Sequence, residues 1–180
     1  MRILAISGSL RAVSSNSAAL QALALLTPSG IEIVLYKGLG QLPFFNPDLE
    51  TDELPQGVVA LRNEIALCDG LIICSPEYAH GIAGAMKNAL DWLVSGVEFP
   101  GKPVVLINTS PRALHAQEQL REILTTMSAQ LIEEASIALP LLGRNLSADD
   151  IAADLQLAGA LRGALQSFVH HIKRHRTEAL

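Results

Sequence analysis

Residues 2–16 read RILAISGSLRAVSSN, and the fold can be argued outward from this stretch. Its first part, 3–6, is an apolar run of strand length. The ten residues 7–16 hold four serines, Gly8 and Asn16 around one charged side chain, Arg11. An apolar strand that ends in hydroxyl groups around a single cation indicates a loop that binds a small anionic ligand.

Four further apolar runs of strand length follow along the chain, and helical spacing separates them. The expected strands are 3–6, 31–35, 71–74, 104–107 and 137–139. The expected helices are 17–26, 58–68, 85–94, 116–131 and 148–174. Strict alternation of strands and helices predicts a parallel sheet covered by helices on both faces, which is a three-layer α/β sandwich. At 180 residues we expect a single domain, 1–180.

Capping signals mark the last expected helix. Ser147 is followed three residues later by Asp150, a capping-box pattern for a helix N-terminus. Lys173 and Arg174 suit the negative end of a helix dipole, so we expect the helix to end among these basic residues.

Composition limits the partners. The net charge is −5, so we expect no nucleic-acid partner, and no apolar run is long enough to cross a bilayer. Charged residues make up 17% of the chain, against about 25% in typical domains, which predicts that some surface is covered in a homodimer or homotetramer.

The two cysteines, Cys68 and Cys74, lie in or beside apolar runs. Their spacing suits neither a zinc site nor a disulfide framework, and we expect buried free thiols in a cytoplasmic protein without a metal site.

The first loop lacks the features of two common nucleotide sites. It has neither the three glycines of G-x-G-x-x-G nor the lysine of a P-loop. It offers hydroxyl and amide donors beside a helix N-terminus, with Arg11 as a bidentate cation, which fits a terminal monophosphate. The donors are Ser9, Ser14, Ser15, Asn16 and Ser17. The competing interpretation is that Asn16 or Ser17 only caps the helix.

Three stretches together resemble the NADPH-dependent FMN reductase family of flavodoxin-like proteins. They are GSLRAVSSNSAAL (8–20), LPFFNPDLE (42–50) and SPEYAHGIAGAMKNALDW (75–92), and the similarity extends over nearly the whole chain. The resemblance implies a doubly wound five-stranded parallel sheet in the order 2-1-3-4-5. It also implies FMN as the cofactor and NADPH or NADH as the co-substrate.

The resemblance assigns site residues as well. Ser9, Arg11, Ser14 and Asn16 match the positions around the FMN phosphate, with Ser17 assisting. Pro76, Glu77 and Tyr78 match the loop along the isoalloxazine ring. For Glu77 we expect a loop-fixing role rather than acid–base catalysis, because hydride transfer to flavin needs no protein proton donor at the accepting nitrogen.

The loop after the fourth expected strand departs from the family pattern. It reads NTSPRALH (108–115) and lacks the glycines usual there. Thr109 and Ser110 remain expected hydrogen-bond partners of the ring. Arg112 and His115 either bind the anionic part of a nicotinamide or an acceptor, or point into solvent.

We therefore expect an FMN-dependent NAD(P)H oxidoreductase with ping-pong hydride transfer and no catalytic side chain, since the flavin carries the chemistry. The expected acceptor is a small molecule: a quinone, chromate, an azo dye or free flavin. One alternative is a flavodoxin-like electron carrier that binds FMN but does not oxidise NADPH. Another is a flavin-free protein that binds a sugar or nucleotide phosphate.

Overall fold

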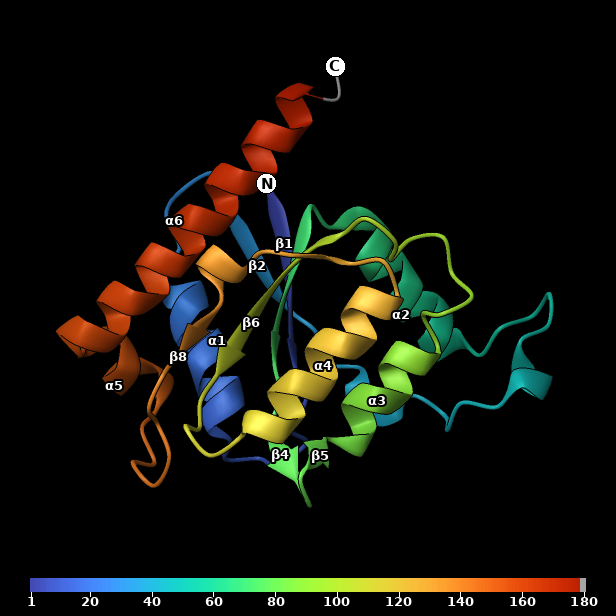
Figure 1. Cartoon of the computed structure of the whole chain (residues 1–180), viewed down its shortest axis with the longest axis horizontal. Coiled ribbons are helices and arrows are strands. Elements are labelled where there is room, and N and C mark those ends of the chain that lie inside the picture. The colour runs from blue at the N-terminus through green and yellow to red at the C-terminus, as the bar shows by residue number, and fades with distance from the viewer. Residues whose placement is uncertain (179–180) are drawn as a thin grey trace.

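The computed structural model describes residues 1–178 and has one main sheet (Figure 1). Its strands are β1 (Arg2–Ser7), β2 (Glu32–Leu35), β3 (Gly70–Cys74), β6 (Pro103–Asn108), β7 (Gln130–Leu131) and β8 (Ile137–Ala138). A separate two-stranded hairpin is formed by β4 (Glu77–Tyr78) and β5 (Gly81–Ile82). The α-helices are α1 (Ser15–Leu25), α2 (Gln56–Leu67), α3 (Gly84–Asp91), α4 (Leu114–Thr126), α5 (Ala148–Ala153) and α6 (Leu155–Glu178). Three short 3-10 helices are η1 (Leu39–Gln41), η2 (Pro47–Leu49) and η3 (Glu133–Ala135).

All pairings in the main sheet are parallel, and the strand order is β2-β1-β3-β6-β7. This order confirms the predicted arrangement 2-1-3-4-5. The carboxyl ends of β1, β3 and β6 therefore lie side by side at one edge of the sheet, which is where ligands bind in open parallel sheets.

The fifth sheet position differs from the prediction. Two short strands share it: β7 pairs with the beginning of β6, and β8 pairs with its end, with η3 between them. The expected helix 116–131 was too long, since α4 ends at Thr126. Ser128 adopts a left-handed φ of 62°, and Ala129 N donates to Leu124 O, which is the six-to-one bond of a Schellman stop.

The capping box at Ser147 and Asp150 is confirmed, but the long final helix is divided. The Asp154 carboxylate accepts hydrogen bonds from the backbone N–H groups of Gln156 (3.0 Å) and Leu157 (3.1 Å). Asp154 thereby ends α5 and caps α6, which continues past the expected basic end to Glu178.

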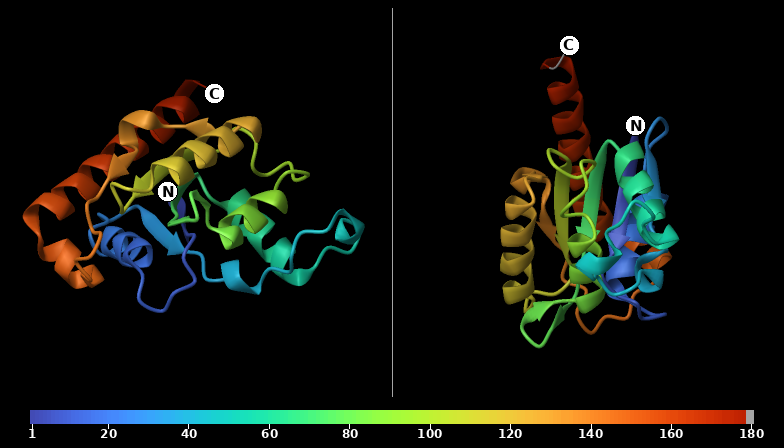
Figure 2. Two further views of the ribbon diagram at one scale, coloured as in Figure 1. Left: turned by 60° about the horizontal axis from the view of Figure 1, so that its bottom comes forward. Right: turned by 90° about the vertical axis from the view of Figure 1, so that its right-hand side faces the viewer.

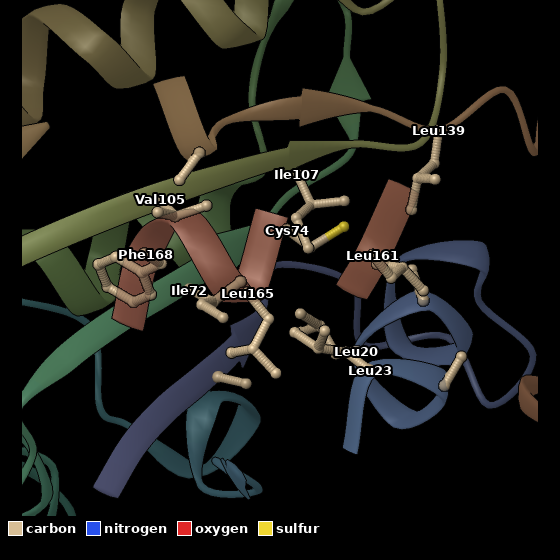
Figure 3. Close-up of a cluster of buried hydrophobic side chains, with 14 of the residues drawn as sticks. Leu20, Leu23, Ile72, Cys74, Val105, Ile107, Leu139, Leu161, Leu165 and Phe168 are labelled. Carbon is tan, nitrogen blue, oxygen red and sulfur yellow. The ribbon is translucent and has the colours of Figure 1, made fainter. Parts of the chain in front are cut away.

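Side chains alternate between two cores on the two faces of the sheet. Helices α1, α5 and α6 pack on one face, and α2, α3 and α4 pack on the other (Figures 1 and 2). Figure 3 shows the first core, where Ile72, Val105 and Ile107 from the sheet meet Leu20 of α1 and Phe168 of α6. Continuous burial on both faces holds the strand ends in a fixed arrangement.

Helix α3 also anchors the long connection after β2, part of which projects beyond the sheet (Figure 1). Trp92 is fully buried, and its Nε1 donates to Pro43 O at 2.8 Å. Asn88 Nδ2 donates to the same carbonyl, and Asn88 Oδ1 accepts from Phe45 N.

Among residues 1–178, no helix combines the length and the hydropathy that crossing a bilayer requires.

Candidate functional site

A cleft of about 360 Å³ crosses the carboxyl ends of β1, β3 and β6. The loops at this edge come together at the bottom of Figure 1. The cleft brings together eight of the predicted site residues: Ser9, Arg11, Ser14, Asn16, Pro76, Glu77, Tyr78 and Ser110. Its other lining residues are Ser15, Ser75, Asn108, Thr109, Arg112, Ala113, Leu142, Gly143 and Asn145.

Ser17 does not line this cleft. Its hydroxyl lies 2.9 Å from the hydroxyl of Ser7, and its backbone N–H donates to Ser14 Oγ. Ser14 is therefore the N-cap of α1, and not Asn16 or Ser17, the two residues named in the competing interpretation. Capping thus accounts for one lining serine, whereas the presence of Ser9 and Arg11 in the same cleft needs another reason.

The first loop suits an anion. The first turn of α1 contains no acidic residue, so its positive end faces the cleft without an internal carboxylate. Arg11 is exposed, lines the cleft and has no ion-pair partner among residues 1–178. A helix N-terminus with one unpaired guanidinium fits a phosphate monoester without a metal ion.

Asn16 connects the loops beneath the cleft. Its buried Oδ1 accepts hydrogen bonds from Thr109 Oγ1 at 3.0 Å and from Cys74 Sγ at 3.2 Å. Burial raises the pKa of the Cys74 thiol far above its ordinary value, so the thiol stays protonated and remains a donor. The amide of Asn16 thus ties the start of α1 to the ends of β3 and β6.

Gly8 permits the close approach of two loops. A Cβ at Gly8 would lie 2.3 Å from Ser75 Oγ and 2.8 Å from Ser75 Cβ. Gly8 N also donates to Cys74 O, which extends the β1–β3 pairing beyond the strands. The single glycine of the loop therefore serves the contact between loops.

The second loop of the cleft follows β3 and forms the hairpin β4–β5, which the sequence pattern does not predict. Its two turn residues, Ala79 and His80, have left-handed φ values of 49° and 59°. Two left-handed residues match the twist of a tight two-residue hairpin, but they are usually Asn or Gly, so no turn signal was visible in the sequence. Tyr78, at the cleft, is 51% exposed and offers its ring to a ligand.

Glu77 fixes this hairpin. One carboxylate oxygen accepts from Ala116 N at 2.9 Å, in the first turn of α4, and the other lies 3.2 Å from His80 Nδ1. The hydrogen bond from Ala116 N is the main cause that holds the pKa of Glu77 below its ordinary value. The nearby His115 and His80 lower it further. An ionised carboxylate that caps a helix agrees with the loop-fixing role predicted for Glu77.

The third loop of the cleft follows β6. It contains no glycine and is held by local hydrogen bonds. Ser110 N donates to Asn108 Oδ1 at 3.0 Å, and Arg112 N donates to Ser110 Oγ at 3.3 Å. Thr109, Ser110 and Arg112 all line the cleft, and Thr109 is the buried one of the three. His115 is not among the lining residues, and its ring packs edge-on against His80 with centroids 4.8 Å apart.

Sequence reasoning missed a fourth contribution. Leu142, Gly143 and Asn145 follow β8 and line the cleft, and Gly143 and Asn145 have left-handed φ values of 76° and 47°. Gly-Arg-Asn after an expected strand was a usable turn signal.

In residues 1–178, no group of three or more His, Cys, Asp or Glu side chains is placed to hold a metal ion.

The fold and the site together define a flavodoxin-like α/β protein with a polar cleft at the carboxyl ends of its central strands. Residues 1–141 match the sequence model of the NADPH-dependent FMN reductases. The chain belongs to this family, and it is an FMN-dependent NAD(P)H oxidoreductase.

Known relatives agree with this membership. An NAD(P)H-dependent FMN reductase of Pseudomonas aeruginosa is 35% identical over 167 residues, covering 86% of this chain and 89% of the relative. A quinone reductase of Escherichia coli is 30% identical over 140 residues, covering 74% of each protein. The solved structure of the flavoenzyme NAD(P)H:(acceptor) oxidoreductase FerB from Paracoccus denitrificans is 29% identical, with a TM-score of 0.85 over 97% of this chain and 98% of that chain.

Proposed function

We propose that the first loop holds the phosphate of FMN and that Pro76, Glu77 and Tyr78 lie along its isoalloxazine ring. The observation that carries the proposal is the position of Arg11, an unpaired cation beside the N-terminus of α1 in the same cleft as Tyr78. A phosphate monoester carries about 1.5 to 2 negative charges at neutral pH and suits these donors.

Bound FMN supplies the hydride chemistry, so the chain's own residues act by binding and orientation. Arg11 and the donors of α1 hold the charged end of the cofactor. Asn16 keeps the first loop aligned with the third through its bond to Thr109. Glu77, ionised against Ala116, keeps the second loop in place and leaves Tyr78 exposed at the cleft.

The electron acceptor that we propose is a quinone or free flavin. It occupies the same space as the nicotinamide, after the oxidised nicotinamide has left. The names of the relatives support these classes. In the structure, Tyr78 and the half-exposed Leu142 both line the cleft and can offer apolar surface to a planar acceptor. Chromate and azo dyes remain further candidates to assay beside these two.

The decisive experiment is an absorbance spectrum of the purified protein, followed by anaerobic addition of NADPH or NADH. We expect a flavin band that bleaches on addition and returns when a quinone is supplied. A flavin band that neither reductant bleaches would point to an electron carrier and reject the proposal. A protein that binds no FMN when reconstituted would reject the phosphate assignment as well.

We also propose that the whole chain, 1–180, forms one FMN-binding domain that assembles as a homodimer or homotetramer in the cytoplasm. Residues 179–180 lie outside the described part. The low charge content and the exposed Phe44, Val94 and Val97 support assembly, and the buried free cysteines fit a reducing compartment. Light scattering of wild type and Phe44→Glu measures the oligomeric state.

A further inference from the structure

Helix α4 begins without a capping side chain of its own. Ala113 occupies its N-cap position, and no side chain there accepts a hydrogen bond from the helix. The acceptor is the carboxylate of Glu77 in the hairpin, which accepts a hydrogen bond from Ala116 N. Glu77 and Ala116 are 39 positions apart in the sequence. The hairpin of the second loop and the helix that follows the third loop are therefore joined at this point.

Gln119, one turn further along α4, makes a second connection to the same hairpin. Its Nε2 donates to His80 O at 3.1 Å, and its Oε1 accepts from Ile82 N at 3.3 Å. One carboxamide thus pairs with the backbone on both sides of Gly81, as a neighbouring strand would. The edge-on packing of His80 against His115 adds a third contact to the same helix.

The turn needs this support because Ala79 and His80 both occupy the left-handed region. Residues other than glycine pay about 1–2 kcal/mol each for that conformation. A two-stranded hairpin is also marginally stable in isolation. The contacts from α4 are therefore what keeps the hairpin in place, and with it Tyr78 at the cleft.

We propose that Gln119 is a positioning residue, which together with Glu77 clamps the hairpin β4–β5 onto α4 and so sets the placement of Tyr78 for the nicotinamide reaction. The inference rests on the proposed function, because it assigns the hairpin to the isoalloxazine side of the cleft. Gln119 does not line the cleft, so it acts through the hairpin.

Three variants separate the clamp from general stability. Gln119→Leu removes both hydrogen bonds, and Gln119→Glu keeps the acceptor for Ile82 N but loses the donor to His80 O. Glu118→Gln, at the adjacent exposed position of α4, is the matched control. The readouts are amide hydrogen exchange at Ile82 in the protein without flavin, the dissociation constant for FMN, and kcat and KM with NADPH.

We expect exchange at Ile82 to rise about fivefold in Gln119→Leu and less in Gln119→Glu, with no change in the control. We expect kcat to fall in the same order while the FMN dissociation constant stays within about twofold, since the phosphate donors lie on another loop. Unchanged exchange and kcat in Gln119→Leu would overturn the proposal, and so would equal losses in FMN affinity and kcat. A wild-type protein that never binds FMN would reject the proposed function instead, while the exchange measurement would still report on the clamp.

Discussion

Thr109 Oγ1 donates a hydrogen bond of 3.0 Å to Asn16 Oδ1 although the two residues are 93 positions apart. Both side chains are buried, and Cys74 Sγ donates to the same oxygen at 3.2 Å. Asn16 lies in the first turn of α1, Cys74 at the end of β3 and Thr109 in the loop after β6. The Asn16 oxygen, as the shared acceptor of the other two, ties the start of α1 to the ends of β3 and β6 before any ligand enters.

Asn16→Ala should therefore destabilise the protein. The substitution leaves two buried donors, Thr109 Oγ1 and Cys74 Sγ, without their acceptor. A buried unsatisfied group costs about 1–3 kcal/mol, so we expect a decrease of that size in the free energy of unfolding. Urea denaturation followed by circular dichroism measures it.

A double-mutant cycle with Thr109→Val tests whether the hydrogen bond is the reason. The two losses should be less than additive, with a coupling of about 0.5–3 kcal/mol. Thr126→Val is the control, because the Thr126 hydroxyl bonds only within its own helix, to Glu122 O, and its loss should add to that of Asn16→Ala. Additive losses for Asn16→Ala and Thr109→Val would show that the two side chains act independently.

The two arginines of the cleft should contribute unequally to FMN binding. Arg11→Ala removes the cation beside the N-terminus of α1, and we expect the FMN dissociation constant to rise about tenfold, as for a lost charge-assisted hydrogen bond. Arg112→Ala alters the opposite loop and should change this constant less. Fluorescence titration of the flavin-free proteins compares them. Equal losses, or a larger loss for Arg112→Ala, would contradict the phosphate assignment.

Sequence reasoning succeeded where one physical signal dominated. The apolar runs 71–74 and 104–107 and the polar loops after them are visible without a structure, because strands buried on both faces must be apolar and ligand loops must not be. The strand order came from family resemblance, since pairing partners are not encoded locally. Eight of the predicted site residues line one cleft, because parallel strands bring their carboxyl ends to one edge of the sheet.

The misses have more than one cause, because some turns lack a local signal in the sequence whereas the Gly143–Asn145 turn carries one. Ser128 ends α4 in a left-handed conformation without a glycine to mark it, and Asp154 divides an otherwise continuous helical pattern. The hairpin turn uses Ala79 and His80, and its partner Gln119 lies nearly 40 positions along the chain. Only the assembled structure shows that α4 stabilises this turn.

Acid should weaken the cap of α5 through Asp150. The hydroxyl of Ser147, at 2.6 Å, and then its backbone N–H lower the pKa of the Asp150 carboxyl in the folded protein. An unfolded aspartate titrates at about 3.9. A lowered folded pKa means that the contribution is fully present above that pH and is lost as the pH falls through the folded value. Asp150→Asn should therefore lower Tm at pH 7, and its Tm should approach that of wild type below about pH 3.9. A Tm difference that stays constant down to pH 2 would contradict this origin.

Gly8→Ala tests the contact between the first and second loops. The added Cβ would lie 2.3 Å from Ser75 Oγ, so one of the two loops must move. Overpacking of this kind costs about 1–3 kcal/mol, and we expect a decrease of that size in the free energy of unfolding together with weaker FMN binding. Ser75→Gly in the same chain removes the side chain that clashes and should restore much of both losses.

Gly159→Ala is the matched control for that substitution. Gly159 lies in α6, and a Cβ there meets nothing within 4 Å. Alanine in place of a helical glycine should raise the free energy of unfolding by about 0.5–1 kcal/mol and leave FMN binding unchanged. The opposite signs of the two Gly→Ala changes follow from the surroundings of each Cβ, since the residue change is the same. If Gly8→Ala bound FMN as tightly as Gly159→Ala, the close approach of Gly8 to Ser75 would have no part in shaping the cleft.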